Sequence, residues 1–277
     1  MQPFITLNNG IMMPQFGLGV WQAKDGAEVE QAVTAAISHG YRLIDTAAVY
    51  GNERGAGRAI TSAPVPREEL FITTKVWNAD QGYDQTLTAF NKSLERLQLD
   101  YIDLYLIHWP TPAKDAYIDT WRALEKLYAD GKVKAIGVSN FTIEHLDRLL
   151  SETTIIPSVN QIELHPQFSQ EELRNYCATH TIAVESYSPL GGTGGNLLEE
   201  PLLRAIGNRH NKSPAQIVLR WHIQHGLIVI PKSVHDQRIA QNIDIFDFTL
   251  SPEEMQALNE LNTNTRIGSN PETANFT

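Results

Sequence analysis

The sequence predicts a (β/α)₈ barrel, a closed ring of eight parallel strands with helices around it. Short apolar segments of strand character alternate along the chain with segments whose apolar residues recur at helical spacing. After the first strand, the others are expected to begin at residues 43, 70, 103, 135, 159, 182 and 227, mostly 23–33 residues apart. Eight units of that length are typical of this barrel. No linker or shift in composition divides the chain, so we expect one domain over residues 1–277.

The barrel is expected to be preceded by a β-hairpin. Short apolar segments within residues 5–12 flank Asn9 and Gly10, a pair typical of tight hairpin turns. Residues 16–19 follow as a weak first strand. Apolar residues at helical spacing within residues 29–37 then predict the first helix, which Gly40 ends.

The later units repeat this order. The other seven strands are expected at residues 43–45, 70–76, 103–109, 135–138, 159–163, 182–187 and 227–230. Helices are expected over residues 170–179 and around the apolar stripes that contain Phe90, Trp121, Leu146 and Trp221. The long step before the last strand predicts an insertion, whose glycine-rich run at residues 191–195 is expected to be a flexible loop. The polar tail from about residue 262 lacks a helical period and is expected to lie as a loop over the barrel mouth.

Composition excludes several classes of protein. The chain has 22 Lys and Arg against 32 Asp and Glu, a net charge of −10, and a negative surface repels nucleic acids and anionic membranes. Cys177 is the only cysteine, which excludes an intramolecular disulfide and a Cys-x-x-Cys zinc or redox site. No segment approaches the roughly 20 apolar residues of a membrane helix, and the N-terminus lacks the pattern of a signal peptide. We therefore expect a cytoplasmic protein with neither a nucleic-acid nor a membrane partner.

Polar side chains at the predicted strand ends mark a candidate site, because barrel active sites form at the C-terminal ends of the strands. Asp45 ends the second strand and Tyr50 follows it; Lys75 lies near the end of the third strand and His108 near the end of the fourth. Each has an ordinary alternative role: a loop cap, a packing tyrosine, a surface lysine and a core histidine. The convergence of four such groups from three neighbouring units favours a site.

The chemistry of this cluster suits a carbonyl group. A buried Lys75 needs an anion, and Asp45 on the adjacent strand is the nearest candidate. A cationic Lys75 beside Tyr50 would stabilise the phenolate, so we expect the pKa of Tyr50 to lie below its usual value of about 10 and the phenol to act as a general acid. His108 would orient the carbonyl oxygen or share the proton. No serine or cysteine adjoins His108, so a nucleophile triad is not expected.

Through the motifs that contain these residues, the chain resembles the aldo-keto reductase family over nearly its whole length. The motifs are GYRLIDTA at 40–47, YGNE at 50–53, TTK at 73–75, LIHWP at 106–110, GVSNF at 137–141, NQIELHP at 160–166 and IPKS at 230–233. Their occurrence together and in order is far more specific than any single motif.

The resemblance implies the reaction. NADPH would deliver hydride to a carbonyl carbon while Tyr50 protonates the oxygen; Lys75 and Asp45 would tune Tyr50, and His108 would orient the carbonyl, without a metal. Within the family the chain is similar to bacterial reductases of 2,5-diketo-D-gluconate, which also reduce keto esters and methylglyoxal. Small aldehydes and ketones are therefore the implied substrates, and a monomer the implied state.

The resemblance also implies a set of cofactor contacts. Ser139, Asn140 and Gln161 would hold the carboxamide, Tyr187 would stack on the nicotinamide, Lys232, Ser233 and Arg238 would hold the 2′-phosphate, and Asn242 would contact the adenine; Ser188, Leu190, Val234 and Gln241 complete the expected set. Ser233 has the alternative role of a helix N-cap, with Asp236 in a capping box, and Arg238 that of a solvated helix residue. Relatives often have Trp at Tyr187, a second basic residue at His235, and a less glycine-rich segment at 191–195.

Three tryptophans at strand ends are expected to form walls of the substrate pocket. Trp21, Trp77 and Trp109 would surround a base made by Tyr50 and His108, with core packing as the alternative.

Three other functions are alternatives to a reductase. A Schiff-base lyase of the same fold would use Lys75 or Lys232, and a nucleotide-sensing module would keep the fold with little turnover. A barrel metallohydrolase is disfavoured, since residues 16–19 lack a His-x-His pair.

Overall fold

A hairpin covers the N-terminal end of the barrel. The computed structural model describes residues 3–192 and 195–277. In it β1 (Phe4–Thr6) and β2 (Met12–Pro14) pair antiparallel, with Thr6 opposite Met12, as the Asn-Gly turn predicts. Leu7 and Met13 pack in one cluster with Leu43 and Phe71, which begin two strands of the barrel. The hairpin thus plugs the end of the barrel opposite the candidate site.

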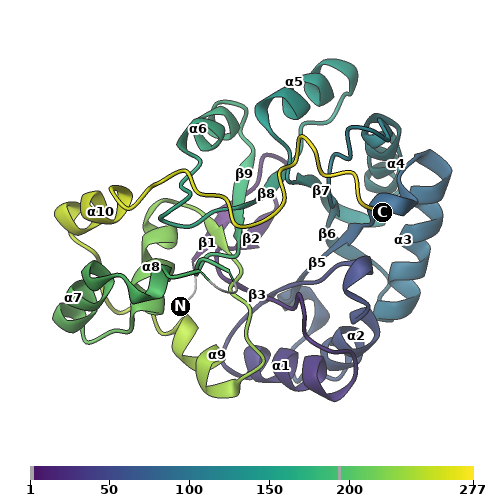
Figure 1. Ribbon diagram of the computed structural model, residues 1–277. Helices are drawn as coiled ribbons and strands as arrows, with labels where there is room; N and C mark the ends of the chain where they lie inside the picture. The colour runs from purple at the N-terminus through teal and green to yellow at the C-terminus, as the bar shows by residue number, and fades with distance from the viewer. Residues whose placement is uncertain (1–2, 193–194) are drawn as a thin grey trace.

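Eight parallel strands form the barrel (Figure 1), which confirms the predicted fold. They are β3 (Gly17–Gly19), β4 (Leu43–Asp45), β5 (Phe71–Val76), β6 (Ile102–Ile107), β7 (Val133–Ser139), β8 (Val159–Glu163), β9 (Ala183–Tyr187) and β10 (Ile228–Val229). Each pairs with the next in chain order. Parallel bridges from Phe16 to Val229 and from Gly19 to Lys232 join the first strand to the last, so the ring closes.

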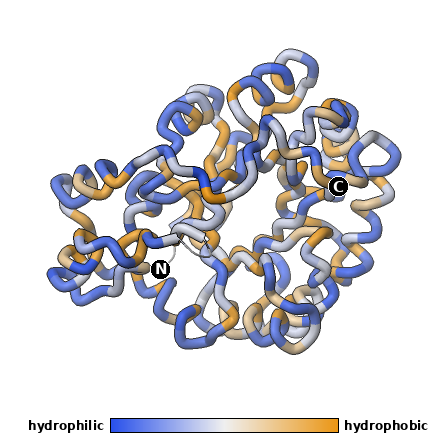
Figure 2. The backbone as a smooth tube through the Cα atoms, in the orientation of Figure 1, coloured by the Kyte–Doolittle hydropathy of each residue, from blue (hydrophilic) through white to orange (hydrophobic). Residues whose placement is uncertain are grey.

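Helices surround this ring on the outside (Figure 1). They are α1 (Ala27–Ser38), α2 (Glu53–Thr61), α3 (Tyr83–Leu97), α4 (Tyr117–Ala129), α5 (Ile143–Glu152), α6 (Glu171–Thr179), α7 (Pro201–His210), α8 (Pro214–Gln224), α9 (Asp236–Ile243) and α10 (Pro252–Asn259). Apolar and polar residues alternate along them (Figure 2), and their apolar faces pack on the strands in a large outer core. The predicted insertion before the last strand consists largely of α7, a helix that the sequence pattern did not predict; α10 was not predicted either.

The C-terminal tail crosses the mouth of the barrel, as expected. It has no helix after α10 within residues 260–277. The backbone N–H groups of Ile267 and Gly268 donate to the Glu163 carboxylate at the end of β8, at 2.6 and 2.7 Å. Further on, the Phe276 ring stacks on Trp77. In Figure 1 this yellow segment runs from α10 over the strand ends to the C-terminus.

Two predictions, about the glycine-rich loop and about membrane helices, can be compared with the structure only over the residues that it describes. Thr193 and Gly194, in the middle of the glycine-rich run, lie outside them, so the expected flexibility of that loop stays a prediction. Within residues 3–192 and 195–277, no helix combines the length and the apolar character needed to cross a bilayer.

Candidate active site

Lys75 and Asp45 form a buried ion pair at the C-terminal ends of β5 and β4. The Lys75 side chain is 0% exposed, and its Nζ lies 2.6 and 2.7 Å from the two carboxylate oxygens of Asp45. Nζ also donates to the carbonyl oxygen of Thr46 at 3.0 Å. Adjacent parallel strands bring the two side chains together, as the sequence predicts, and the pairing offsets the cost of burying the ammonium.

Tyr50 lies beside this pair, in a short 3₁₀ turn, η1 (Ala48–Tyr50), after β4. Its hydroxyl oxygen is 3.4 Å from Lys75 Nζ. Gly51 ends the turn with a φ of 68°, a left-handed conformation that favours glycine. Asn52, fully buried, then donates to the carbonyls of Val20 and Ala23 at 2.9 and 3.0 Å. The YGNE motif therefore fixes the Tyr50 turn to the loop that follows β3.

The pKa of Tyr50 moves opposite to the prediction. Burial raises it to about 12, and the opposing effect of Lys75 is smaller; the expected net lowering is wrong because the phenol is desolvated as well as paired. For Lys75, burial is the largest single influence and lowers the pKa, but the charge and hydrogen bond of Asp45, together with the smaller effects of Tyr50 and Glu185, outweigh it, and the net pKa lies above the ordinary value. At neutral pH the site thus holds a protonated tyrosine beside a charged lysine.

His108 is a neutral imidazole in the same cluster. Burial, and then the charge of Lys75, holds its pKa well below the usual value. The ring lies edge-on to Tyr50 and to Trp77, with centroids 5.6 and 5.3 Å away. Its Nδ1 is buried and has no hydrogen-bond partner among the described residues. A neutral ring at this point offers an N–H to an oxygen bound beside Tyr50.

Three residues of the expected carboxamide group lie at neighbouring strand ends. Gln161 Nε2 donates to Asp45 Oδ2 and to Glu185 Oε2, each at 2.8 Å. Ser139 Oγ donates to the carbonyl of Gln161 at 2.9 Å and accepts from Asn140 Nδ2 at 3.1 Å. With both amide hydrogens engaged, Gln161 has its Oε1 left as an acceptor.

Tyr187, at the end of β9, joins this group through its hydroxyl. The phenol donates to Asn140 Oδ1 at 2.7 Å, and Asn140 Nδ2 donates in turn to the carbonyl of His108 at 3.0 Å. Asn140 has a φ of 63°, unusual for a residue other than glycine, and these bonds stabilise it there. A tryptophan at position 187 has no hydroxyl with which to make the first bond.

The expected phosphate-binding residues gather after β10. Lys232 and Arg238 are exposed and form no ion pair with any described residue, and both flank the start of α9. The alternative role of Ser233 as helix N-cap is wrong: α9 begins after His235, and Ser233 Oγ instead accepts from the His235 N–H at 3.1 Å. Two unpaired cations near a helix N-terminus suit an anion.

The remaining expected cofactor residues differ in exposure. Asn242 is buried and Gln241 exposed on α9, while Val234 and Leu190 are half-buried against the outer core. Ser188 has a φ of 48° directly after β9, and its carbonyl accepts from the Gly191 N–H at 3.0 Å.

Aromatic rings build one wall of the mouth. Trp77 stacks on Phe276 with centroids 5.9 Å apart, and Trp109 meets Phe276 edge-on at 5.3 Å. Trp21, in contrast, is 52% exposed on the loop after β3 and makes no ring contact with these residues. The structure therefore brings Trp77 and Trp109 together through Phe276, but not Trp21.

Sequence reasoning missed two residues of this region. Phe276 lies in a tail with no periodicity, and its only signal is an aromatic residue in a polar segment. Glu185 lies inside the barrel beside Gln161; its signal is a charge within the apolar run at 182–187.

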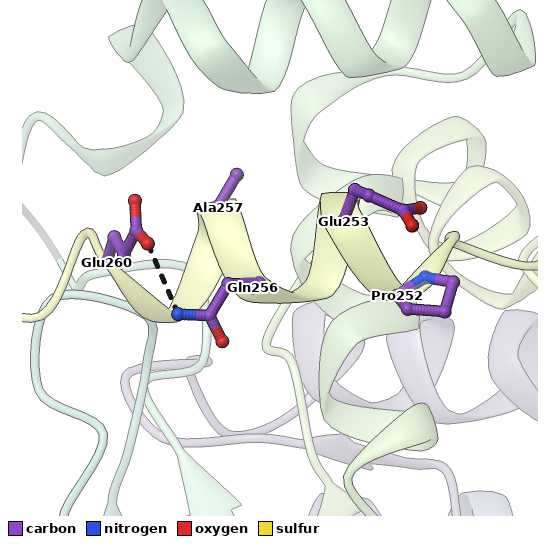
Figure 3. A pocket seen from close by; sticks show the side chains of 5 residues that line it. All are labelled: Pro252, Glu253, Gln256, Ala257 and Glu260. Carbon is purple, nitrogen blue, oxygen red and sulfur yellow. Dashed lines mark hydrogen bonds between the residues drawn. The ribbon is translucent and has the colours of Figure 1, made fainter.

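A surface hollow of about 400 Å³ elsewhere on the molecule is separate from this site. It runs along α10 and is lined by Pro252, Glu253, Gln256, Ala257 and Glu260 (Figure 3). Figure 1 shows α10 at the periphery, away from the strand ends. In the described part of the chain, no three His, Cys, Asp or Glu side chains converge as a metal site.

Fold and site together define a (β/α)₈ barrel that holds Tyr50, Lys75, Asp45 and His108 at its strand ends. The sequence model of the Aldo/keto reductase family matches residues 15–263. Glyoxal reductase of Bacillus subtilis (strain 168) is 57% identical over 268 residues, which cover 97% of this chain and 96% of that protein. Methylglyoxal reductase of Yersinia pestis is 53% identical over 272 residues, 98% of this chain and 97% of that protein.

The fold agrees with solved structures as well. A crystal structure of a Gox0644 mutant in complex with NADPH is 46% identical, with a TM-score of 0.95 over 100% of both chains. The chain belongs to the aldo-keto reductase family, as its motifs predict. It is accordingly an oxidoreductase.

Proposed function

We propose that the chain is an NADPH-dependent reductase of small aldehydes and ketones in which Tyr50 donates the proton. The observation that carries this proposal is the half-buried Tyr50 beside the buried pair of Lys75 and Asp45, with a neutral His108 next to it. The Tyr50 pKa of about 12 keeps the phenol protonated, and therefore able to donate, at neutral pH.

Each of these side chains has one task. His108 donates a hydrogen bond that orients the substrate oxygen toward Tyr50, and the Tyr50 hydroxyl gives its proton to that oxygen as negative charge develops there. Lys75 stabilises the phenolate that remains, since it faces the hydroxyl from 3.4 Å. Asp45 holds Lys75 in its charged form. NADPH, when bound, supplies the hydride that the carbonyl carbon accepts.

The residues at the strand ends fit the nicotinamide carboxamide. Gln161 Oε1 is the acceptor left for a carboxamide N–H, because both Nε2 hydrogens go to carboxyl groups. Ser139 Oγ supplies a further polar contact, and the Tyr187 ring a stacking face. Lys232 and Arg238 are the cations we propose for the 2′-phosphate, together with Ser233; Asn140, Ser188, Leu190, Val234, Gln241 and Asn242 are proposed to complete the contacts.

For the substrate we propose methylglyoxal and similar small dicarbonyls first, then 2,5-diketo-D-gluconate and keto esters. The names of the glyoxal and methylglyoxal reductases among the relatives support this order. Trp77, Trp109 and Phe276 supply an aromatic wall beside His108 that suits a small, partly apolar carbonyl compound. Trp21 is proposed as a further contact on the open side.

We also propose that residues 1–277 act as one domain, as a monomer and in the cytoplasm. The buried, unpaired thiol of Cys177 supports a reducing compartment. A Schiff-base role for Lys75 is disfavoured, because such a nucleophile must be a neutral amine and Asp45 keeps this one charged.

The test is the loss of NADPH absorbance with methylglyoxal as substrate. Tyr50→Phe should lower kcat by about 10²–10⁴-fold, the usual contribution of a positioned general acid, while the Kd for NADPH stays close to that of the unaltered protein. Tyr83→Phe, on the exposed side of α3, is the matched control and should keep full activity. A Tyr50→Phe variant with unreduced kcat would refute the proton-donor role.

A further inference from the structure

Glu185 is a buried carboxyl group inside the barrel to which the proposed reaction gives no role. It lies in the middle of β9 and is 0% exposed. Its Oε2 accepts from Gln161 Nε2 at 2.8 Å. Its Oε1 is buried and has no hydrogen-bond partner among the described residues. A group this deeply placed, with one oxygen unsatisfied, requires a physical reason.

The charges around Glu185 do not balance if it is ionised. The same Gln161 Nε2 bridges Glu185 and Asp45, so two carboxyl groups share one amide. Among the described residues, the one cation in contact with this group is Lys75, which is held by both oxygens of Asp45 and faces Tyr50. An ionised Glu185 would thus be a second buried anion with no cation in contact, which is strongly unfavourable.

The strand neighbours of Glu185 carry no charge. Its register partners are Gln161 on β8 and Ile228 on β10. The titratable groups that face it across the barrel interior are Asp45 on β4, Lys75 on β5 and Tyr50 in η1. Among these described groups, Lys75 forms its ion pair with Asp45 and not with Glu185.

We propose that Glu185 holds a proton at neutral pH and acts as a positioning residue, fixing the Gln161 amide and keeping the charge beside Tyr50 balanced. The effect of Glu185 on turnover rests on the proposed function of Tyr50, whereas the protonation of Glu185 is independent of that function. Burial, and then the charge of Asp45, raises the pKa of Glu185 above that of an ordinary glutamate, against smaller opposing effects of Gln161 and Lys75.

Loss of this proton at alkaline pH has a direct consequence for the site. A negative Glu185 raises the pKa of Tyr50, which makes the phenol a weaker acid. Turnover should therefore fall on the alkaline side of the pH profile as Glu185 ionises, before Tyr50 itself loses its proton.

The first experiment measures protonation without reference to activity. Between the glutamate pKa of the unfolded chain, about 4.3, and the raised folded pKa, the folded state binds one more proton, so stability falls as pH rises. Glu185→Gln removes that proton. The ratio of the unfolding equilibrium constants, wild type over Glu185→Gln, should rise about tenfold per pH unit from about pH 5 to 7.

Glu163→Gln is the matched control for this measurement. Glu163 is also buried, but bonds from His165 and from the tail amides outweigh its burial and lower its pKa, so its ratio should stay flat over the same range. The infrared band of a protonated carboxylic acid should be present in the wild type at pH 7 and absent in Glu185→Gln. A flat ratio for Glu185→Gln, or an unchanged infrared spectrum, overturns the proposal.

The second experiment measures the effect on the reaction. In Glu185→Gln the alkaline limb of the kcat profile should move to higher pH, whereas Glu185→Leu, which loses the bond to Gln161, should raise the KM for NADPH about 2–10-fold. If the alkaline limb of the kcat profile stays at the same pH in Glu185→Gln, the charge-balancing role is refuted. If Tyr50→Phe keeps its rate while the stability ratio still rises, the proton-donor function fails and the protonation of Glu185 stands.

Discussion

Replacing Lys75 with methionine removes the cation that neutralises Asp45 inside the barrel. The two side chains are 0% and 3% exposed, and Lys75 Nζ lies 2.6 Å from Asp45 Oδ1. Removal of one partner from a buried pair costs about 3–5 kcal/mol, because the other charge is left uncompensated. Asp45 still accepts a hydrogen bond from Gln161, so we expect the lower end, about 3 kcal/mol.

This loss should grow with pH. Without Lys75, a charged Asp45 is buried with no cation in contact among the described residues, and uptake of a proton by the folded variant relieves that cost. The stability of the variant then falls as pH rises and that proton is lost. The double variant Asp45→Asn with Lys75→Met carries neither charge and keeps an acceptor for Gln161, and it should recover most of the loss.

Thermal unfolding at pH 5 and pH 8 provides the assay. For a chain of this size, 1 kcal/mol corresponds to a shift of about 2–4 °C, so Lys75→Met should melt about 6–12 °C below the wild type at pH 8 and closer to it at pH 5. If the single variant melts no lower than the double variant at pH 8, or if its Tm difference is independent of pH, the reasoning about the buried pair is wrong.

Two further predictions concern the cofactor side. Tyr187→Phe keeps an aromatic face but removes the 2.7 Å bond to Asn140, so the Kd for NADPH, measured by fluorescence quenching, should rise about 2–10-fold; an unchanged Kd would show that the hydroxyl does not position Asn140. Arg238→Ala should raise the Kd for NADPH about 10–100-fold and that for NADH far less, since a charge-assisted bond is lost with only one of them; equal increases would refute the 2′-phosphate assignment.

Much of the site could be predicted because its residues are marked by local patterns. Asp45, Lys75 and His108 interrupt or end apolar strands, and parallel strands in a barrel bring their ends to one rim whatever the details of packing. The pairing of Lys75 with Asp45 follows from adjacency in the strand order. The aromatic wall was less predictable: Phe276 reaches Trp77 because the tail is fixed at Glu163 and, through the Phe276 carbonyl, at Asn78, both far away in the sequence.

The sequence by itself determined the barrel, the hairpin before it and the set of chemical groups at the rim, since alternating periodicity and strand-end polarity are properties of short segments. The tertiary structure alone decided the electrostatic balance. Whether the pKa of Tyr50 is raised or lowered depends on how completely the phenol is desolvated, and the position of Glu185 beside Gln161 and Asp45 depends on closure of the ring. These pKa shifts depend on burial and on contacts across the barrel between residues more than a hundred positions apart in the sequence. No local sequence pattern contains that information.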